Sequence, residues 1–378
     1  MTSAVLPGRA VIERAARVFY NELTSFSKSR GGLGIQRQNP TSLKRLNAAG
    51  DRLSRMLLQP IASAGSKRLV IIPDGALQYI PFAALIKPES KQRMAVAHEI
   101  VTLPSLSVLS ELRDEIANRP VARKTLAVFA DPVVEEDDLR FDANKPDLNK
   151  PRSRRRAGNA RRGFAVIESE REPLAGSRRA DEPVNFVRLP FAAEEAKKLA
   201  ALVADNEREV WTGFDANREK AMKEDLSRFR LIHFATHGLL DFRRPRLSCL
   251  LLSRFDRQRQ LQDGYLRLQD VYNMKLSADL VVLSACQTAL GKEIKGEGLI
   301  GLTRGFLYAG AARVAASLWD VDDGASAALM ERFYRKMLGP ERMSPAAALR
   351  AAQIEMMREP RWQDPYFWAA FVLQGEWK

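Results

Sequence analysis

Short apolar runs alternate along this chain with longer amphipathic stretches. Runs of about four to eight residues rich in valine, isoleucine and leucine predict buried strands. The expected strands are 68–72, 98–103, 125–130, 209–211, 230–235, 247–252, 279–285 and 314–318. The amphipathic stretches predict helices at 105–118, 192–203, 217–226, 298–308, 325–338 and 345–357. This alternation is typical of an α/β fold, so we expect a three-layer α/β/α sandwich around a mostly parallel central sheet.

Residues 1–64 differ from the rest because they show only helical patterns. Basic amphipathic stretches at 10–23 and 42–58 predict two helices. We expect these residues to form a helical appendage packed on one α/β domain at 65–378. No repeat of about 34 residues is evident within them, and too little chain precedes the domain for an array of helical repeats.

Two of the expected strands lead directly to reactive side chains. The run 230–235 is followed by His237 and Gly238, and the run 279–285 is followed by Cys286. Because the carboxyl ends of parallel strands open on one crevice, we expect the histidine and the cysteine to share a site.

A cysteine beside an imidazole can act as a nucleophile, because the imidazole removes the thiol proton or stabilises the thiolate. The pair therefore indicates covalent acyl transfer, in which Cys286 attacks a carbonyl and His237 returns a proton to the leaving group. The backbone N–H groups of Gly238 and Cys286 could form the oxyanion hole.

Each reactive residue also has a structural interpretation. A thiol after an apolar strand is most often an inert core residue, which is what we expect of Cys249. His233 shares strand parity with His237 but lies about 13 Å from it at about 3.3 Å per residue, so only one of them can reach a given thiol. We choose His237. The same separation argues against a metal site, because the two imidazoles could not bind one ion.

The composition indicates a globular protein in a reducing compartment. The chain has 378 residues, 46% of them hydrophobic, and no apolar stretch reaches the roughly 18 residues of a membrane span. The first residues lack the apolar core of a secretory signal, and two cysteines do not build a disulfide framework in a chain of this size. We therefore expect a cytoplasmic location without membrane association.

Half of the net charge of +14 is concentrated in one block. Residues 150–162 carry seven cations and no acid, and we expect the surrounding insertion 142–183 to be a solvated, poorly ordered loop. The block could hold phosphates through counterion release. It lacks the interleaved aromatic residues of a single-strand platform, however, so nucleic-acid binding is the weaker interpretation.

A glycine-rich segment, 296–301, matches the G-x-G-x-x-G pattern of dinucleotide sites, and Asp320 follows about 20 residues later. The context does not fit, because about ten residues separate the preceding strand from the motif and Glu297 would repel a pyrophosphate. We therefore expect no cofactor, and we expect this loop to shape a cleft beside Cys286.

The sequence also resembles a known family over residues 67–378. The segments that carry the resemblance include His233-Phe-Ala-Thr-His-Gly238 and Leu283-Ser-Ala-Cys-Gln-Thr-Ala289, with further matches at 69–85, 103–109, 127–132, 296–298, 309–311, 317–323 and 368–375. Together they resemble the CHAT family of caspase-like cysteine peptidases, which are related to caspases and separase. The family pattern places its catalytic histidine at His237 and its cysteine at Cys286.

The resemblance implies a regulated cysteine endopeptidase that cleaves a protein partner in a defence or cell-death setting. In many relatives the peptidase follows tetratricopeptide repeats that sense a partner. This chain would then be a compact member, a piece of a longer protein, or a subunit regulated in trans. The alternative is a noncatalytic scaffold that uses the same fold to bind a partner.

The segment after strand 314–318 carries the candidates for substrate selection. It contains Trp319, Asp320, Asp322 and Asp323, and it resembles the separase segment in which an acid recognises an arginine before the cut. A partly buried carboxylate favours a guanidinium, so Asp320 or Asp323 would select arginine or lysine. The alternative is that these acids cap the helix beginning near residue 325.

Overall fold

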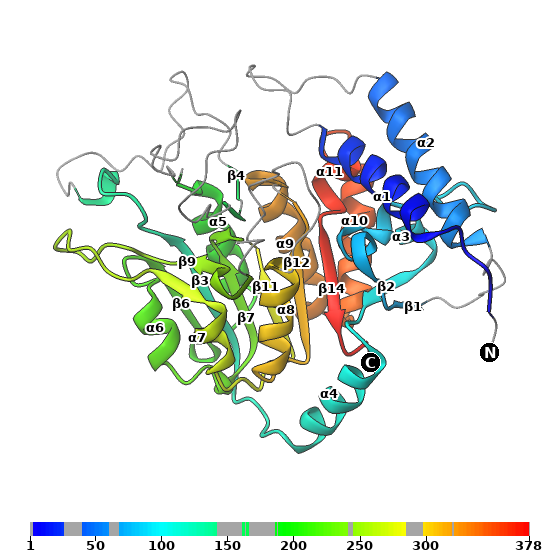
Figure 1. The fold of residues 1–378 in the computed structure, drawn as a ribbon. Coiled ribbons are helices and arrows are strands. Elements are labelled where there is room, and N and C mark those ends of the chain that lie inside the picture. The colour runs from blue at the N-terminus through cyan, green and yellow to red at the C-terminus, as the bar shows by residue number, and fades with distance from the viewer. Residues whose placement is uncertain are drawn as a thin grey trace, which may run out of the picture.

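A computed structural model of the chain has an eight-stranded central sheet (Figure 1). The described residues are 3–25, 40–59, 68–141, 161–162, 164–165, 186, 188–240, 245–284, 298–319 and 321–377. The strands lie in the order β1 (Arg68–Ile71), β2 (Glu99–Thr102), β14 (Phe371–Gly375), β12 (Arg313–Ser317), β11 (Leu280–Leu283), β7 (Phe229–Ala235), β3 (Lys124–Pro132) and β6 (Arg208–Gly213).

The sheet is mostly parallel, as the sequence predicts. Strands β12, β11, β7, β3 and β6 run in one direction. Strand β14, red in Figure 1, runs antiparallel to β12, and β2 and β1 follow its direction. Strand β14 is absent from the strands expected above, because an apolar run that contains aromatic residues does not distinguish a strand from a helix by its period.

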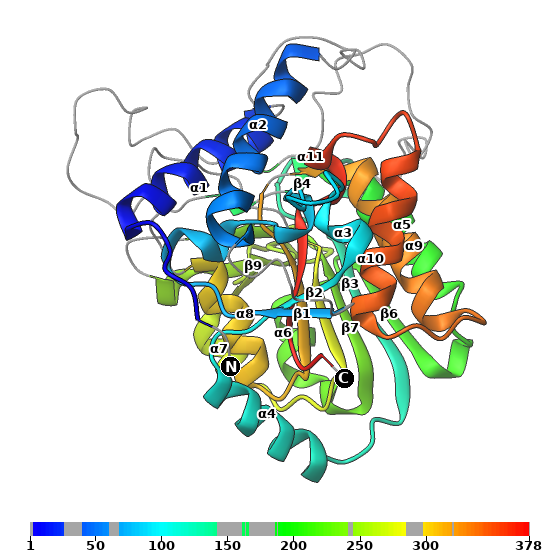
Figure 2. The ribbon, with the colours of Figure 1, turned by 90° about the vertical axis from the view of Figure 1, so that its right-hand side faces the viewer.

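Helices cover both faces of this sheet. Figure 2 shows α5 (Pro190–Ala200), α9 (Asp323–Leu338) and α10 (Pro345–Arg358) on one side, with α7 (Leu268–Tyr272) and α8 (Gly298–Tyr308) on the other. The remaining helices of the α/β domain are α3 (Met94–Ala97), α4 (Leu106–Asn118), α6 (Arg218–Lys223) and α11 (Pro365–Trp368). The expected three-layer sandwich is confirmed.

The two expected N-terminal helices form and pack on each other, as α1 (Arg9–Thr24) and α2 (Pro40–Leu57). Their apolar faces bury Phe19, Leu23 and Leu53 in the same hydrophobic cluster that surrounds the central sheet. The helices are therefore continuous with the core of the α/β domain rather than a separately packed unit.

Two small sheets lie outside the central one. The first has the order β10 (Tyr265–Arg267), β9 (Cys249–Leu251), β8 (His237–Leu239) and β5 (Phe164–Ala165). The second pairs β13 (Val321–Asp322) with β4 (Arg161–Arg162).

Four residues of the basic insertion 142–183 belong to these small sheets, in β4 and β5, and the rest of the insertion lies outside the described residues. The physical reason is that β8 and β13 each present a backbone edge whose N–H and C=O groups gain partners when a strand is added.

Candidate functional site

The register of β7 and β11 brings the two reactive segments to the same edge of the sheet. Leu283 pairs with Phe234 in parallel strands, and the N–H of Ser284 donates a 2.8 Å hydrogen bond to the Phe234 carbonyl. Ser284 stands two positions before Cys286, and Phe234 stands three before His237. The predicted nucleophile Cys286 itself lies outside the described residues, as does Glu297.

His237 is the first residue of β8, not the last residue of the central strand that precedes it. Strand β7 ends at Ala235, and Thr236 donates a side-chain hydrogen bond to the Leu251 carbonyl. The chain thereby turns from the central sheet into the small one, where His237 pairs with Leu251. Only 6% of His237 is exposed to solvent. Strand β7 thus ends at residue 235, as expected from the sequence, and His237 belongs to the next strand.

An aromatic side chain from a distant segment fixes one side of the His237 ring. The Phe186 ring lies 5.6 Å from the imidazole, measured between ring centroids, at an interplanar angle of 48°. Phe186 is buried, and its N–H donates a 2.8 Å hydrogen bond to Glu135 Oε1. Sequence reasoning missed Phe186, because nothing local to a residue just beyond the basic insertion indicates contact with His237.

A charge pair holds the chain that follows Phe186. Arg188 donates to both carboxylate oxygens of Asp131, at 3.0 and 2.7 Å. Asp131 is buried near the carboxyl end of β3 and has φ +48°, a conformation that non-glycine residues rarely adopt. Arg140 also pairs with Asp131, at 3.1 Å. These contacts anchor the entry into α5 beside the candidate site.

Gly238 lies between two strands of the small sheet. It pairs with Leu250 of β9 and with Phe164 of β5. The backbone proposed for an oxyanion hole therefore lies inside the small sheet, directly after His237.

The other histidine of this segment is a core residue, as the choice of His237 requires. His233 is fully buried, with Nδ1 3.1 Å from the Tyr334 hydroxyl and Nε2 2.7 Å from Glu195 Oε1. Burial raises the pKa of Tyr334 well above its usual value, and the adjacent Glu195 carboxylate adds to this rise.

The second cysteine is inert, which confirms its interpretation as a core thiol. Cys249 is buried in β9, and its burial raises the pKa of the thiol to about 12. A thiol with this pKa carries almost no thiolate at neutral pH, so it is a poor nucleophile.

The acidic segment after β12 shows mainly structural contacts. Asp322 Oδ1 accepts a 2.9 Å hydrogen bond from Ala325 N–H and so caps α9. Asp323 is 1% exposed, and its Oδ2 accepts from Phe191 N–H at the start of α5. Trp319 is buried and donates from Nε1 to the Tyr366 carbonyl. Asp320 lies outside the described residues.

Residues 47–376 match the model of the CHAT domain. This chain belongs to the CHAT domain family. The match begins within α2, so it includes part of the N-terminal helical pair as well as the α/β domain.

Two curated relatives contain a segment similar to this CHAT domain. Tetratricopeptide repeat protein 28 of Mus musculus is 36% identical over 115 residues, which are 30% of this chain and 5% of the relative. The protein of the same name from Homo sapiens is 26% identical over 343 residues, covering 82% of this chain and 12% of the relative. The CHAT domain thus spans only a small part of these relatives.

Two solved structures illustrate chains with a similar path. The chain aligns over 99% of its length with 23% of a chain in the Saccharomyces cerevisiae separase–securin complex, with a TM-score of 0.46 and 14% identity. It aligns over 97% of its length with 74% of the Arg-specific cysteine proteinase gingipain R, with a TM-score of 0.42 and 10% identity.

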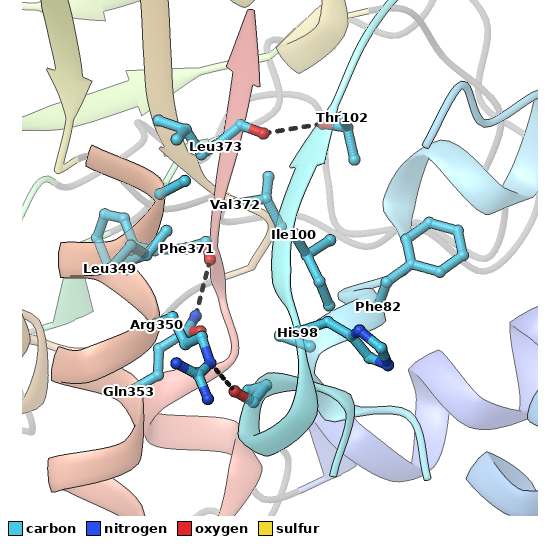
Figure 3. Close-up of a pocket in the computed structure, with 13 residues that line it drawn as sticks. Phe82, His98, Ile100, Thr102, Leu349, Arg350, Gln353, Phe371, Val372 and Leu373 are labelled. Carbon is cyan, nitrogen blue, oxygen red and sulfur yellow. Dashed lines mark hydrogen bonds between the residues drawn. The ribbon is translucent and has the colours of Figure 1, made fainter. Parts of the chain in front are cut away.

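A pocket of the CHAT domain lies away from His237, between α10 and strands β2 and β14 (Figure 3). Its polar lining includes His98, Arg350 and Gln353. Arg350 donates to the carbonyls of Ala95 and Val96, and Gln353 donates to two further carbonyls, so both side chains join elements of the core.

Within the described ranges, no group of three or more histidine, cysteine or acidic residues could hold a metal ion. The described helices also include none that is long and apolar enough to cross a bilayer.

Proposed function

We propose that this CHAT domain is a cysteine endopeptidase that uses Cys286 as nucleophile and His237 as general base and acid. The observation that supports it is the parallel register of β7 and β11, from which the segments of both residues leave the sheet at one edge. Retention of both residue types at these positions favours catalysis over a scaffold that only binds a partner.

The proposed reaction proceeds in two steps. His237 takes the thiol proton of Cys286 as its sulfur attacks the peptide carbonyl, and the resulting oxyanion accepts hydrogen bonds from the N–H groups of Gly238 and Cys286. The C–N bond then breaks as His237 gives its proton to the leaving amine. A water molecule deprotonated by His237 hydrolyses the thioester, which releases the carboxylic acid and restores the thiol.

The proposed substrate is a protein cut after arginine or lysine, with Asp320 as the selecting carboxylate. Asp323 is the other candidate acid, but its carboxylate is 1% exposed and accepts a hydrogen bond from Phe191 N–H. Trp319 is likewise buried, and we assign it and Asp323 to the support of the pocket, with Glu297 at its rim.

The relatives of this CHAT domain are tetratricopeptide repeat proteins of which it spans a small part. We therefore propose that the peptidase activity is regulated by a repeat-containing protein segment, supplied in the same chain or in trans.

Peptide cleavage by matched cysteine variants tests the proposal. Peptides that vary at the residue before the cut are incubated with the unaltered protein, with Cys286→Ala and with Cys249→Ala, and the products are identified by mass spectrometry. We expect cuts after arginine or lysine. Cys286→Ala and His237→Ala should abolish these cuts, and Cys249→Ala should preserve them.

If the protein needs an activator and cleaves no peptide without it, labelling by an electrophilic peptide that reacts with thiolates still tests the dyad. Labelling of Cys286 that His237→Ala slows would support the dyad without turnover. A Cys286 that is labelled no faster than a free thiol, with no cleavage, would instead favour the noncatalytic scaffold. Cuts after other residues would discard the assignment to Asp320 alone.

A further inference from the structure

The amino ends of the parallel strands form a basic edge, at the end of the central sheet opposite to the candidate site. Strand β3 begins at Lys124, β6 at Arg208 and β12 at Arg313, and Arg230 is the second residue of β7. Strand β11 differs, because an acid, Asp279, directly precedes it. In Figure 1, α4 lies at this end of the sheet and β4 lies at the other.

Several cations on this edge are paired with nearby acids. The Lys124 ammonium lies 2.6 Å from Glu209, and Arg208 pairs with Asp205. Pairs of this kind balance the charge of each cation locally, so they give no reason to expect a further anion.

The charge around Asp279 is not balanced in this way, because three arginines contact this one residue. Arg119 Nη2 donates to Oδ1, and Arg230 Nε donates to Oδ2 at 3.1 Å. Arg313 Nη1 donates to the backbone carbonyl of Asp279 at 3.3 Å. Three guanidinium groups therefore surround a single carboxylate and leave an excess of two positive charges.

The electrostatics of Arg313 show the effect of this excess. The residue is half-buried, and burial is the main reason that its pKa is lowered from the usual value. The Asp279 and Glu376 carboxylates oppose this change, whereas the neighbouring Arg119 and Arg68 add to it. Positive charges held close together in a partly desolvated place attract an anion.

Arg230 makes this charge accessible from solvent. Its side chain is 48% exposed, and that of Asp279 is 34% exposed. Within the part of the chain that the structure describes, only Nε of this guanidinium donates a hydrogen bond to another residue. Nη1 and Nη2 are therefore available to a ligand. Arg119 is 17% exposed and already donates to the carbonyls of Ala278 and Gly310.

The size of the excess charge indicates the kind of ligand. A phosphate monoester carries about 1.5 to 2 negative charges at pH 7, which matches the excess of two, whereas a carboxylate supplies one. The planar guanidinium also presents parallel N–H donors that bind two phosphate oxygens at once.

We propose that Arg230, Arg119 and Arg313 form a binding site for the phosphate group of a soluble small molecule. Arg230 donates to the phosphate oxygens, and the other two arginines contribute positive charge from behind it. The site lies at the start of β7 and β12, so it is separate from the proposed peptidase site and does not depend on it.

Titration calorimetry of the full-length protein with inorganic phosphate tests the site. At constant ionic strength we expect one saturable site with a Kd of about 1 mM or lower, which two charge-assisted hydrogen bonds would supply. Acetate, a monoanion, should bind at least about tenfold more weakly. Equal affinity for the two anions, or no saturable binding of phosphate, would overturn the proposal.

A matched pair of arginine variants locates the binding. Arg230→Gln removes the exposed guanidinium and should raise the Kd for phosphate about tenfold. Arg257→Gln is the control, because Arg257 is 63% exposed and lies 2.8 Å from a single acid, Asp215. Its Kd should equal that of the unaltered protein. An equal change in both variants, or in neither, would reject Arg230 as a phosphate ligand.

The variant Asp279→Asn separates a binding site from a purely structural cluster. It removes the carboxylate that competes with the ligand for the same arginines, so the Kd for phosphate should fall by at least about fivefold. A cluster that only supports the fold predicts lower stability without tighter binding. If this variant does not fold, Arg230→Gln decides the matter, because it changes an exposed side chain.

The same phosphate group occurs in lipid headgroups, and sedimentation with vesicles distinguishes the two sources. Vesicles of equal parts phosphatidylcholine and phosphatidic acid should not bind the protein through Arg230 if the ligand is a soluble molecule. Sedimentation with these vesicles that Arg230→Gln abolishes and Arg257→Gln preserves would overturn the soluble ligand in favour of a membrane surface.

Discussion

The hydroxyl of Tyr20 donates a 3.1 Å hydrogen bond to the carbonyl of Leu318, although 298 residues separate them in sequence. The Tyr20 ring also meets the Trp319 ring edge to face, with 6.2 Å between centroids. Helix α1 therefore packs directly on the end of β12, the strand that leads into the proposed substrate-selecting segment.

Replacing Tyr20 with phenylalanine should lower the free energy of unfolding by about 1–2 kcal/mol. Tyr20 is 2% exposed, so the change removes a buried hydrogen bond and leaves the Leu318 carbonyl without this donor. Urea denaturation would measure the loss. Tyr272→Phe is the matched control, because Tyr272 is 44% exposed and its change should stay within about 0.5 kcal/mol. Equal stability of the two variants would contradict the prediction.

Removing the Phe186 ring should impair catalysis beyond its effect on stability. Phe186→Ala deletes the ring that packs on His237, so we expect kcat for peptide cleavage to fall about tenfold while KM changes little, because a mispositioned base acts on the chemical step.

Phe255→Ala is the control for this change, because Phe255 has the same exposure of 8% and packs on Phe141. Both variants should lose about 3 kcal/mol of stability, as for other buried phenylalanines. If both lowered kcat equally, the ring at Phe186 would have no special role in holding His237.

Truncating Glu195 should destabilise the fold strongly. Its carboxylate lies 2.7 Å from His233 Nε2, and both residues are fully buried where α5 packs on β7. Removing one partner of a buried pair leaves the other unpaired, which costs about 3–5 kcal/mol. Glu194→Ala on the exposed side of the same helix should cost under about 0.5 kcal/mol. A small loss for Glu195→Ala in thermal or chemical unfolding would show that His233 finds another partner.

Cys249 should make stability depend on alkaline pH. Burial raises the pKa of its thiol from about 9 to about 12, so below pH 9 the thiol is protonated in both folded and unfolded chains. Between these values the unfolded chain loses this proton and the folded chain keeps it, so the free energy of unfolding falls as pH rises.

The measurement is the slope of unfolding free energy against pH in this range, compared between the unaltered protein and Cys249→Ala. The variant should lack up to about 1.4 kcal/mol per pH unit of that slope. Identical slopes would mean that the folded chain ionises Cys249 as readily as the unfolded chain does.

The sequence by itself determined the elements whose signals are local. The apolar run that became β7 and the helical pattern that became α8 depend on residue order within one segment. The hydrophobic period, the length of a run and the neighbouring residue types predict these elements. They do so because the side chains that share one face of a helix or strand are close together in sequence.

Only the tertiary structure determined which residues contact each other when they are far apart in sequence. Sequence could not place Phe186 on His237, Tyr20 on Leu318, or β4 and β5 on their strands, and it did not predict the strand that begins at His237. These contacts depend on which backbone edges and apolar faces remain open after the central sheet has formed. Only the folded chain determines that, because a strand edge accepts any segment that supplies matching N–H and C=O groups.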